Sequence, residues 1–292
     1  MFNAIKKIGY FILCIRLHRN SVRVLTSVYA LYGAITTFAN IKIYNIGSWF
    51  DFWKIAVTIM CVYVAAFLAC GIYDALVNKH KLFNLHNGHM AYYLYGDILD
   101  PKIIKSKHKN IVISVNRGFD TEVDNEIISE TSLHGQCFKL LYESQEYTKT
   151  KLKKKISAFL QEINVRGEEF PEKKRGNKIK YPVGTVAEVP AGDAKYFLVA
   201  LSTFRGDSTQ TTEEEYSLVL ARLFERICSR SQGYPFLIPL IGAGLSKTGI
   251  NENILFDMLK NFILIYKDKI HCDIYIVLST NYKYKIPRKS SL

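Results

Sequence analysis

The stretch Phe236-Leu-Ile-Pro-Leu-Ile-Gly-Ala-Gly-Leu-Ser-Lys-Thr-Gly249 decides the fold of this chain. Its apolar first part, residues 236–241, predicts a buried strand. The strand breaks at Gly242, and residues 250–266 predict a helix directly after the turn. Glycine has no Cβ, so the backbone of such a turn can approach a ligand closely. Backbone N–H groups and the positive end of a helix favour phosphate, and we interpret the turn as a diphosphate cradle.

Three other interpretations of this glycine loop stay open. A P-loop would need Gly-x-x-x-x-Gly-Lys-Ser/Thr; Lys247-Thr248 match its end, but Ser246 replaces the last glycine. A Rossmann fingerprint would need Gly-x-Gly-x-x-Gly; Gly242 and Gly244 match, but Lys247 occupies the third glycine position. An ordinary strand-to-helix turn needs neither motif. The loop therefore has to be interpreted together with the rest of the chain.

Length and composition narrow the class of protein. The chain has 292 residues, a formal net charge of +13 and 49% hydrophobic residues. One sizeable domain and a further module fit this length. A basic and hydrophobic chain suits a membrane-attached protein with cationic surfaces, and no recognition motif accompanies the charge, so we expect no nucleic-acid partner. The six cysteines show no close spacing, so we expect reduced thiols and no metal site.

Two long uncharged stretches lie near the start of the chain. Residues 24–41 and 55–73 carry no charged side chain, and a helix needs about 20 mostly apolar residues to cross a bilayer. We predict transmembrane helices at about residues 22–43 and 55–76, within a membrane module of residues 1–84. The connector holds aromatic side chains of the kind that line membrane interfaces, namely Tyr44, Trp49, Phe50, Phe52 and Trp53.

The basic residues around these stretches predict an orientation. Five precede the first stretch and Lys79 and Lys81 follow the second, whereas the connector has Lys42 and Lys54 opposed by Asp51. Positive charge favours the cytoplasmic side, so a multi-pass hairpin with both termini in the cytoplasm is expected. A buried helical hairpin of a soluble protein is the alternative, because the first stretch is polar for a membrane helix.

Residues 85–292 have a different texture, in which strand-like and helix-like segments alternate. Strands are predicted at residues 89–95, 110–115, 196–203, 236–241 and 273–279, with another after Val186. Helices are predicted at residues 122–134, 151–163, 213–229 and 250–266. This alternation predicts a three-layer α/β domain. Residues 168–180 are charged and predict an exposed loop or hairpin without a catalytic signature.

Polar groups that suit a nucleotide follow three of these strands. Asp97, in Gly96-Asp97-Ile98, could accept from the exocyclic amine of adenine, while the next backbone N–H donates to a ring nitrogen. Asn116 ends the second strand and could bond a ribose hydroxyl. The glycine loop would hold a diphosphate between them, because open α/β sheets bind ligands beyond the carboxyl ends of their strands. Each feature alone also fits common turn chemistry.

In this order the motifs resemble a macro domain, the ADP-ribose-binding module. The resemblance covers about residues 90–284 and rests on Gly96-Asp97-Ile98, Val115-Asn116, Gly184-Thr185-Val186 and residues 239–249. It implies a macro-type fold with a mixed sheet and an ADP-ribose derivative as ligand, with no cofactor. It also implies ligand contacts from three of these four motifs and from a residue stacked on adenine: Asp97, Ile98, Asn116, Gly242, Ala243, Gly244, Leu245, Ser246, Lys247, Thr248, Gly249 and Tyr282.

The loop after Asn116 departs from the macro domains that cleave ADP-ribose esters. Those proteins usually carry Ala-Asn and a run of glycines at this place. Here the loop has bulky or charged residues instead, namely Arg117, Phe119, Asp120, Asp124, Glu130 and His134. The change removes the usual loop for a hydrolytic water, so we expect no catalytic residue. An acidic residue could receive an amino group and Arg117 a carboxylate, although acidic residues at a helix start would also explain the pattern. We add Arg117, Phe119 and Asp120 to the ligand contacts.

With two predicted spans ahead of it, this domain resembles the membrane-anchored macro effectors of Thoeris anti-phage defence. The resemblance implies a non-enzymatic receptor in the bacterial inner membrane. A TIR-domain enzyme would make its nucleotide signal from NAD, in this branch an ADP-ribose joined to histidine. Binding would drive homo-oligomerisation, membrane disruption and abortive infection. A membrane-tethered ADP-ribosyl hydrolase is the alternative, and turnover of the ligand would distinguish the two.

Overall fold

The computed structural model describes residues 15–39, 49–205, 208–210, 212–244, 249–282 and 286. The chain divides into two compact units, Met1–Asn78 and Lys79–Leu292. The first strand of the sheet, β1, begins at Lys79, so the sheet starts before the predicted domain boundary at residue 85. The segment is rich in basic residues and lies at the edge of the sheet, where polar strands are common.

The first unit contains the helices α2 (Ile15–Ala39) and α3 (Trp49–Leu76). They touch where the ring of His18 on α2 meets Tyr63 and Phe67 on α3. Within the described part of the chain, one helix is long and apolar enough to cross a membrane, over the 21 residues Trp53–Tyr73. The predicted span at residues 22–43 extends beyond α2 into residues that the structure does not describe, so it stays a prediction.

The second unit is built on a mixed sheet with the strand order β1-β2-β10-β9-β3-β7-β6, to which β8 adds beside β7. The strands are β1 (Lys79–Asn84), β2 (Met90–Tyr95), β3 (Lys109–Asn116), β6 (Val186–Ala191), β7 (Ala194–Arg205), β8 (Ser208–Gln210), β9 (Phe236–Pro239) and β10 (Ile274–Leu278). The neighbours β2, β10, β9, β3 and β7 are parallel, whereas β1 and β6 pair antiparallel with the strand beside them. The carboxyl ends of the parallel strands therefore all lie at the same end of the sheet, which we call its carboxyl edge.

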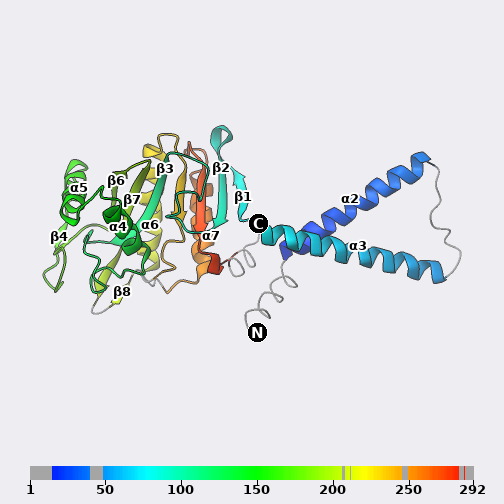
Figure 1. Cartoon of the computed structure of the whole chain (residues 1–292), viewed down its shortest axis with the longest axis horizontal. Helices are drawn as coiled ribbons and strands as arrows, with labels where there is room; N and C mark the ends of the chain where they lie inside the picture. The colour runs from blue at the N-terminus through cyan, green and yellow to red at the C-terminus, as the bar shows by residue number, and fades with distance from the viewer. Residues whose placement is uncertain are drawn as a thin grey trace. The chain divides into compact units, whose positions relative to one another are not determined.

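Two pairs of helices cover the faces of this sheet (Figure 1). Helices α6 (Glu213–Arg230) and α7 (Glu252–Ile265) bury their apolar stripes in one core cluster. Helices α4 (Leu133–Glu143) and α5 (Lys149–Glu162) do so in the other. Side chains alternate between the two clusters along the central strands, as Phe197 and Leu198 do on β7. The predicted three-layer α/β fold of the macro type is confirmed.

The predicted helix at residues 122–134 is wrong, since α4 begins only at Leu133. Side-chain oxygens capture the backbone N–H groups that a helix would have needed. Asp124 Oδ1 accepts from the N–H groups of Glu126 and Ile127, at 3.0 and 2.7 Å. Asn125 adopts a φ of 64° and accepts from Glu130 N. Such local bonds compete with helix formation, so the segment folds as turns although Ile127 and its neighbour Ile128 are buried.

Candidate ligand-binding site

The predicted motifs follow four neighbouring strands, and the sheet brings their loops to one edge. Asp97 follows β2, Tyr282 follows β10, the glycine loop follows β9, and Asn116 ends β3. These strands are adjacent and parallel, so the loops lie in the order adenine motif, stacking residue, diphosphate loop and ribose motif. The sequence could predict this convergence because a sheet of parallel strands collects the loops after them.

The adenine motif is fixed by the end of β2. Gly96 N donates to Leu278 O of β10 at 2.9 Å, which joins the two strand ends. A Cβ on Gly96 would lie 2.4 Å from the side chain of Ile103, so the turn has little room here. The Asp97 side chain is exposed, and its Oδ1 accepts from Leu99 N at 2.9 Å. Ile98 is buried beneath it, so its side chain anchors the loop while the carboxylate faces outward.

The glycine loop begins after Pro239, the last residue of β9. Gly242 and Gly249 adopt φ values of +83° and +72°, which residues with a Cβ rarely take. Gly244 is exposed, and a Cβ placed on it would meet no atom within 4 Å. Open space therefore lies beside its backbone, as a phosphate cradle requires. The predicted contacts Leu245, Ser246, Lys247 and Thr248 lie outside the described residues.

Tyr282 lies next to the glycine loop. It ends a short 3-10 helix, Thr280–Tyr282, directly after β10, and its hydroxyl donates to Ala243 O at 3.4 Å. Partial burial raises the pKa of its phenol. The ring thus lies between the adenine motif and the diphosphate loop along the edge, where a residue that stacks on adenine is expected.

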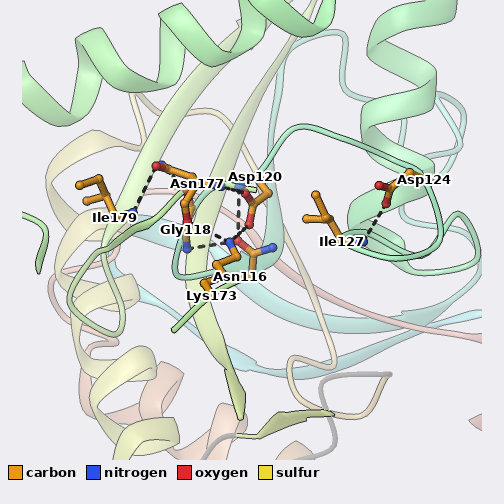
Figure 2. A network of polar contacts seen from close by, with 8 residues as sticks. All are labelled: Asn116, Gly118, Asp120, Asp124, Ile127, Lys173, Asn177 and Ile179. Atoms are coloured by element: carbon orange, nitrogen blue, oxygen red, sulfur yellow. Dashed lines mark hydrogen bonds and ion pairs between the residues drawn. The ribbon is translucent and has the colours of Figure 1, made fainter. Parts of the chain in front are cut away.

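Asn116 uses part of its side chain to order its own loop (Figure 2). The side chain is buried, and its Oδ1 accepts from Gly118 N at 3.1 Å and from Asp120 N at 3.3 Å. Within this turn Phe119 has a φ of 48° and packs edge-on against Tyr181, with 5.6 Å between ring centroids. Because Phe119 is buried, its side chain acts on the shape of the loop.

Asp120 is also buried and is bound from a distant segment. Its Oδ2 forms an ion pair with Lys173 Nζ, and its Oδ1 accepts from Asn177 N at 2.5 Å. Lys173 and Asn177 belong to the hairpin of β4 (Glu168–Glu169) and β5 (Ile179–Lys180). Sequence reasoning missed both residues, since the basic run at Lys173 resembles a solvated surface and its partner lies far away in the chain.

The other charged residues predicted after Asn116 also have partners within the chain. Arg117 Nε donates to Tyr181 O at 2.7 Å, and its guanidinium lies 3.6 Å from Glu215. Asp124 pairs with Arg175, and Glu130 pairs with Lys139. A ligand carboxylate or amino group would therefore compete with an existing partner at each of these positions. Their roles as ligand contacts stay predictions.

His134 is buried at the start of α4 against the ring of Phe138, 4.4 Å away between centroids. Burial lowers the pKa of its imidazole to about 3, opposed by a hydrogen bond with the backbone of Asp120. The side chain is therefore neutral at physiological pH and cannot serve as an imidazolium acid. This environment suits a structural histidine.

The described residues contain no cluster of three or more His, Cys, Asp or Glu that could hold a metal ion. What this edge offers is chemistry for an uncharged base and an anionic linker. There is an exposed carboxylate at Asp97, a tyrosine ring at Tyr282, open glycine backbone and a buried amide at Asn116. A nucleoside diphosphate matches these groups.

The sheet, its two helical layers and the loops at its carboxyl edge define a macro-type α/β domain. Residues 94–279 match the family model described as Thoeris protein ThsA, Macro domain, which is more than half of the 292-residue chain. The chain belongs to this family.

The chain is similar to a Thoeris protein in sequence and to macrodomains among solved structures. The Thoeris protein ThsA of Bacillus amyloliquefaciens (strain Y2) is 32% identical over 176 residues, which is 57% of this chain and 54% of that protein. The chain thus matches about half the length of this relative. Among solved structures, an Oceanobacillus iheyensis macrodomain mutant with ADPR has a TM-score of 0.47 at 13% identity, covering 72% of this chain and 95% of that one. The same macrodomain with ADP has a TM-score of 0.43 at 11% identity, covering 73% and 95%.

Proposed function

We propose that this protein is a membrane-attached receptor for an ADP-ribose-derived signal in Thoeris anti-phage defence. Membership of the Thoeris ThsA macro-domain family supports the defence role. The observation that supports this ligand is that the loops after four strands meet at the carboxyl edge of the sheet, where Tyr282 is bonded to Ala243 of the glycine loop. Adenine would lie at Asp97, the diphosphate over the glycines, and the distal ribose at Asn116.

The signal is an ADP-ribose that carries a further group on its distal ribose, histidine in this proposal, and a TIR-domain enzyme makes it from NAD. The loop after Asn116 supports recognition of an extended ligand, because it replaces a glycine run with residues that pack and pair. The same loop favours binding over hydrolysis. Its acid, Asp120, is buried and bonded on both oxygens, and the neighbouring His134 is held neutral.

The output of the receptor is at the bacterial inner membrane. The stretch Trp53–Tyr73 on α3 has the length of a membrane span, and only 11% of it is buried within the protein, unlike the core helix of a soluble domain. In this proposal α2 supplies a second crossing and both termini lie in the cytoplasm. Ligand binding then leads to homo-oligomerisation, membrane disruption and abortive infection.

The first test is calorimetric titration of ADP-ribose into the full-length protein, purified in detergent. We expect Asp97→Ala and Gly244→Phe each to weaken binding at least about tenfold, which is a loss of about 1.4 kcal/mol. The first removes the proposed acceptor for the adenine amine, and the second fills the space proposed for the diphosphate. Asp100→Ala is the matched control, because this exposed aspartate of the same loop caps Lys102 N and is not part of the site. Undiminished binding in both site variants would show that the pocket lies elsewhere.

The same protein preparations, incubated with ADP-ribose joined to histidine, separate the receptor from the alternative hydrolase, because a hydrolase would release free ADP-ribose from this conjugate. Ligand recovered after prolonged incubation is measured by mass spectrometry. A receptor returns the ADP-ribose derivative intact and in stoichiometric amount. Multiple turnovers by the wild type would favour the membrane-tethered ADP-ribosyl hydrolase instead.

A further inference from the structure

We infer that the β4–β5 hairpin, residues 168–180, is a clamp that sets the ribose end of the site, with Lys173 and Asp120 as its positioning residues. The inference rests on the proposed function and goes beyond it, since it assigns selectivity for the part of the ligand beyond the diphosphate. Neither residue needs to touch the ligand. Both act through the loop of residues 116–120.

A short series of bonds connects the hairpin to Asn116 (Figure 2). Lys173 Nζ pairs with Asp120 Oδ2 and also donates to Asn177 O at 3.1 Å. Asn177 closes the junction, because its N donates to Asp120 Oδ1 and its Nδ2 donates to Gly118 O at 2.8 Å. Asp120 N in turn donates to Asn116 Oδ1. The conformation of the Asn116 side chain thus depends on a segment more than fifty residues later in the chain.

The burial of this ion pair indicates a purpose beyond surface solvation. The side chains of Lys173 and Asp120 are only 8% and 3% exposed. Removing two charges from water is costly unless their geometry is good and their other hydrogen bonds are made. Here each Asp120 oxygen has a partner, and the Lys173 ammonium group bonds both Asp120 and Asn177. Removing one partner would leave the other charge buried without its counter-charge, and the loop would have to rearrange to bring that charge to water.

The backbone around the pair is fitted to it. A Cβ on Gly118 would lie 2.8 Å from Lys173 Nζ and 3.1 Å from Asp120 Oδ2. Gly176 has a φ of +84°, and a Cβ there would lie 2.4 Å from Asp120 Oδ1. Two glycines from separate segments therefore bring the backbone close to this carboxylate and ammonium, which a generic surface hairpin does not require.

The clamp acts on one end of the ligand only. Asn116 Oδ1 is taken by Gly118 N and Asp120 N, so the amide Nδ2 is the group that a ribose hydroxyl would meet. The adenine motif at Asp97 and the diphosphate loop at Gly244 are held by β2, β9 and β10 instead. Loosening the clamp should therefore weaken the binding of ADP-ribose, which has a distal ribose, and leave the binding of ADP, which has none, unchanged.

The test compares both nucleotides by calorimetry on full-length protein in detergent. We expect Lys173→Met to lower the affinity for ADP-ribose about tenfold or more, by analogy with the loss of metal affinity when a group that orients a metal ligand is removed. Affinity for ADP should stay within about twofold of wild type, which also reports that the variant is folded. Lys174→Met is the matched control, since this neighbouring lysine is exposed and should change neither affinity.

A double-variant cycle supplies the signature of a pair. Asp120→Asn should have the same nucleotide-selective effect as Lys173→Met, and the double variant should bind ADP-ribose no worse than either single, because it leaves no unpaired buried charge. Equal losses of ADP and ADP-ribose, or no loss in Lys173→Met, would overturn the clamp while leaving the proposed function intact. Wild-type protein that binds neither nucleotide would overturn both.

Discussion

At the scale of single residues, His134 makes the stability of the domain depend on pH. Its imidazole is buried, with a folded pKa of about 3 against an ordinary 6.5. Below pH 6.5 the His134 imidazole is therefore protonated in the unfolded chain but not in the folded chain. The penalty is absent above pH 6.5 and grows as the pH falls towards 3. At pH 5.5 it amounts to about 1.4 kcal/mol.

We expect His134→Asn to remove this dependence. Asparagine cannot titrate, and its amide can still donate towards the backbone of Asp120. Urea unfolding of both proteins at pH 7.5 and 5.5 gives the difference in free energy of unfolding, and wild type should lose about 1.4 kcal/mol more than the variant between these two pH values. Comparing the two proteins cancels the titration of all other groups. Parallel losses would show that the imidazole is protonated in the folded state.

The residues after Asn116 show what a sequence can and cannot predict at this scale. Their bulk and charge are visible in the chain, and from them the loss of a glycine-lined loop follows. Their partners are not visible. Asp120 pairs with Lys173, 53 positions away, and Arg117 lies near Glu215, and no periodic pattern relates such residues. The contacts come from the tertiary fold, which brings the hairpin and the start of α6 to this loop.

At the scale of elements, the start of α4 depends on a single glycine. Ser132 caps the helix by accepting from Gly135 N at 3.0 Å, and a Cβ on Gly135 would lie 2.2 Å from Ser129 O. That oxygen belongs to backbone and cannot swing away. We expect Gly135→Ala to lower the free energy of unfolding by about 1–3 kcal/mol, as overpacking does.

Urea denaturation of Gly135→Ala measures this cost, and Gly244→Ala serves as its matched control. A methyl group on Gly244 would meet no atom within 4 Å, so the same substitution there should leave stability within about 0.5 kcal/mol of wild type. Equal stability of the two variants would mean that the loop before α4 yields to the extra methyl group.

Which elements the sequence predicts depends on how each is stabilised. Strands such as β3, β9 and β10 are buried on both faces, so an unbroken apolar run reveals them. The turns at residues 122–132 are not predicted, because Ile127 and Ile128 have helical spacing with Val123. The side chains of Asp124 and Asn125 bond the local backbone instead, and the helix does not form. The basic edge strand β1 has Leu82 and Phe83 as its apolar residues, too short a run to predict a strand.

At the scale of the whole molecule, the family match and the membrane-type helix fall on different units. Residues 94–279 of the second unit carry the family relationship, whereas Trp53–Tyr73 lies in the first. A receptor that acts at a membrane needs both. The anchoring of the first unit is therefore the property that most directly tests the proposed output.

A lysine at the centre of a membrane span costs about 2.5–3.5 kcal/mol on insertion scales, so it should release a protein that one or two helices anchor. We expect Val64→Lys, in the middle of the α3 stretch, to move full-length protein from the carbonate-resistant membrane pellet to the supernatant. Val28→Lys on α2 tests the second crossing, since Val28 and Val64 are comparably exposed, at 46% and 47%. The two-span hairpin requires that Val28→Lys also weaken retention. Full retention of Val28→Lys would leave α3 as the sole anchor and place the two ends of the chain on opposite sides of the membrane.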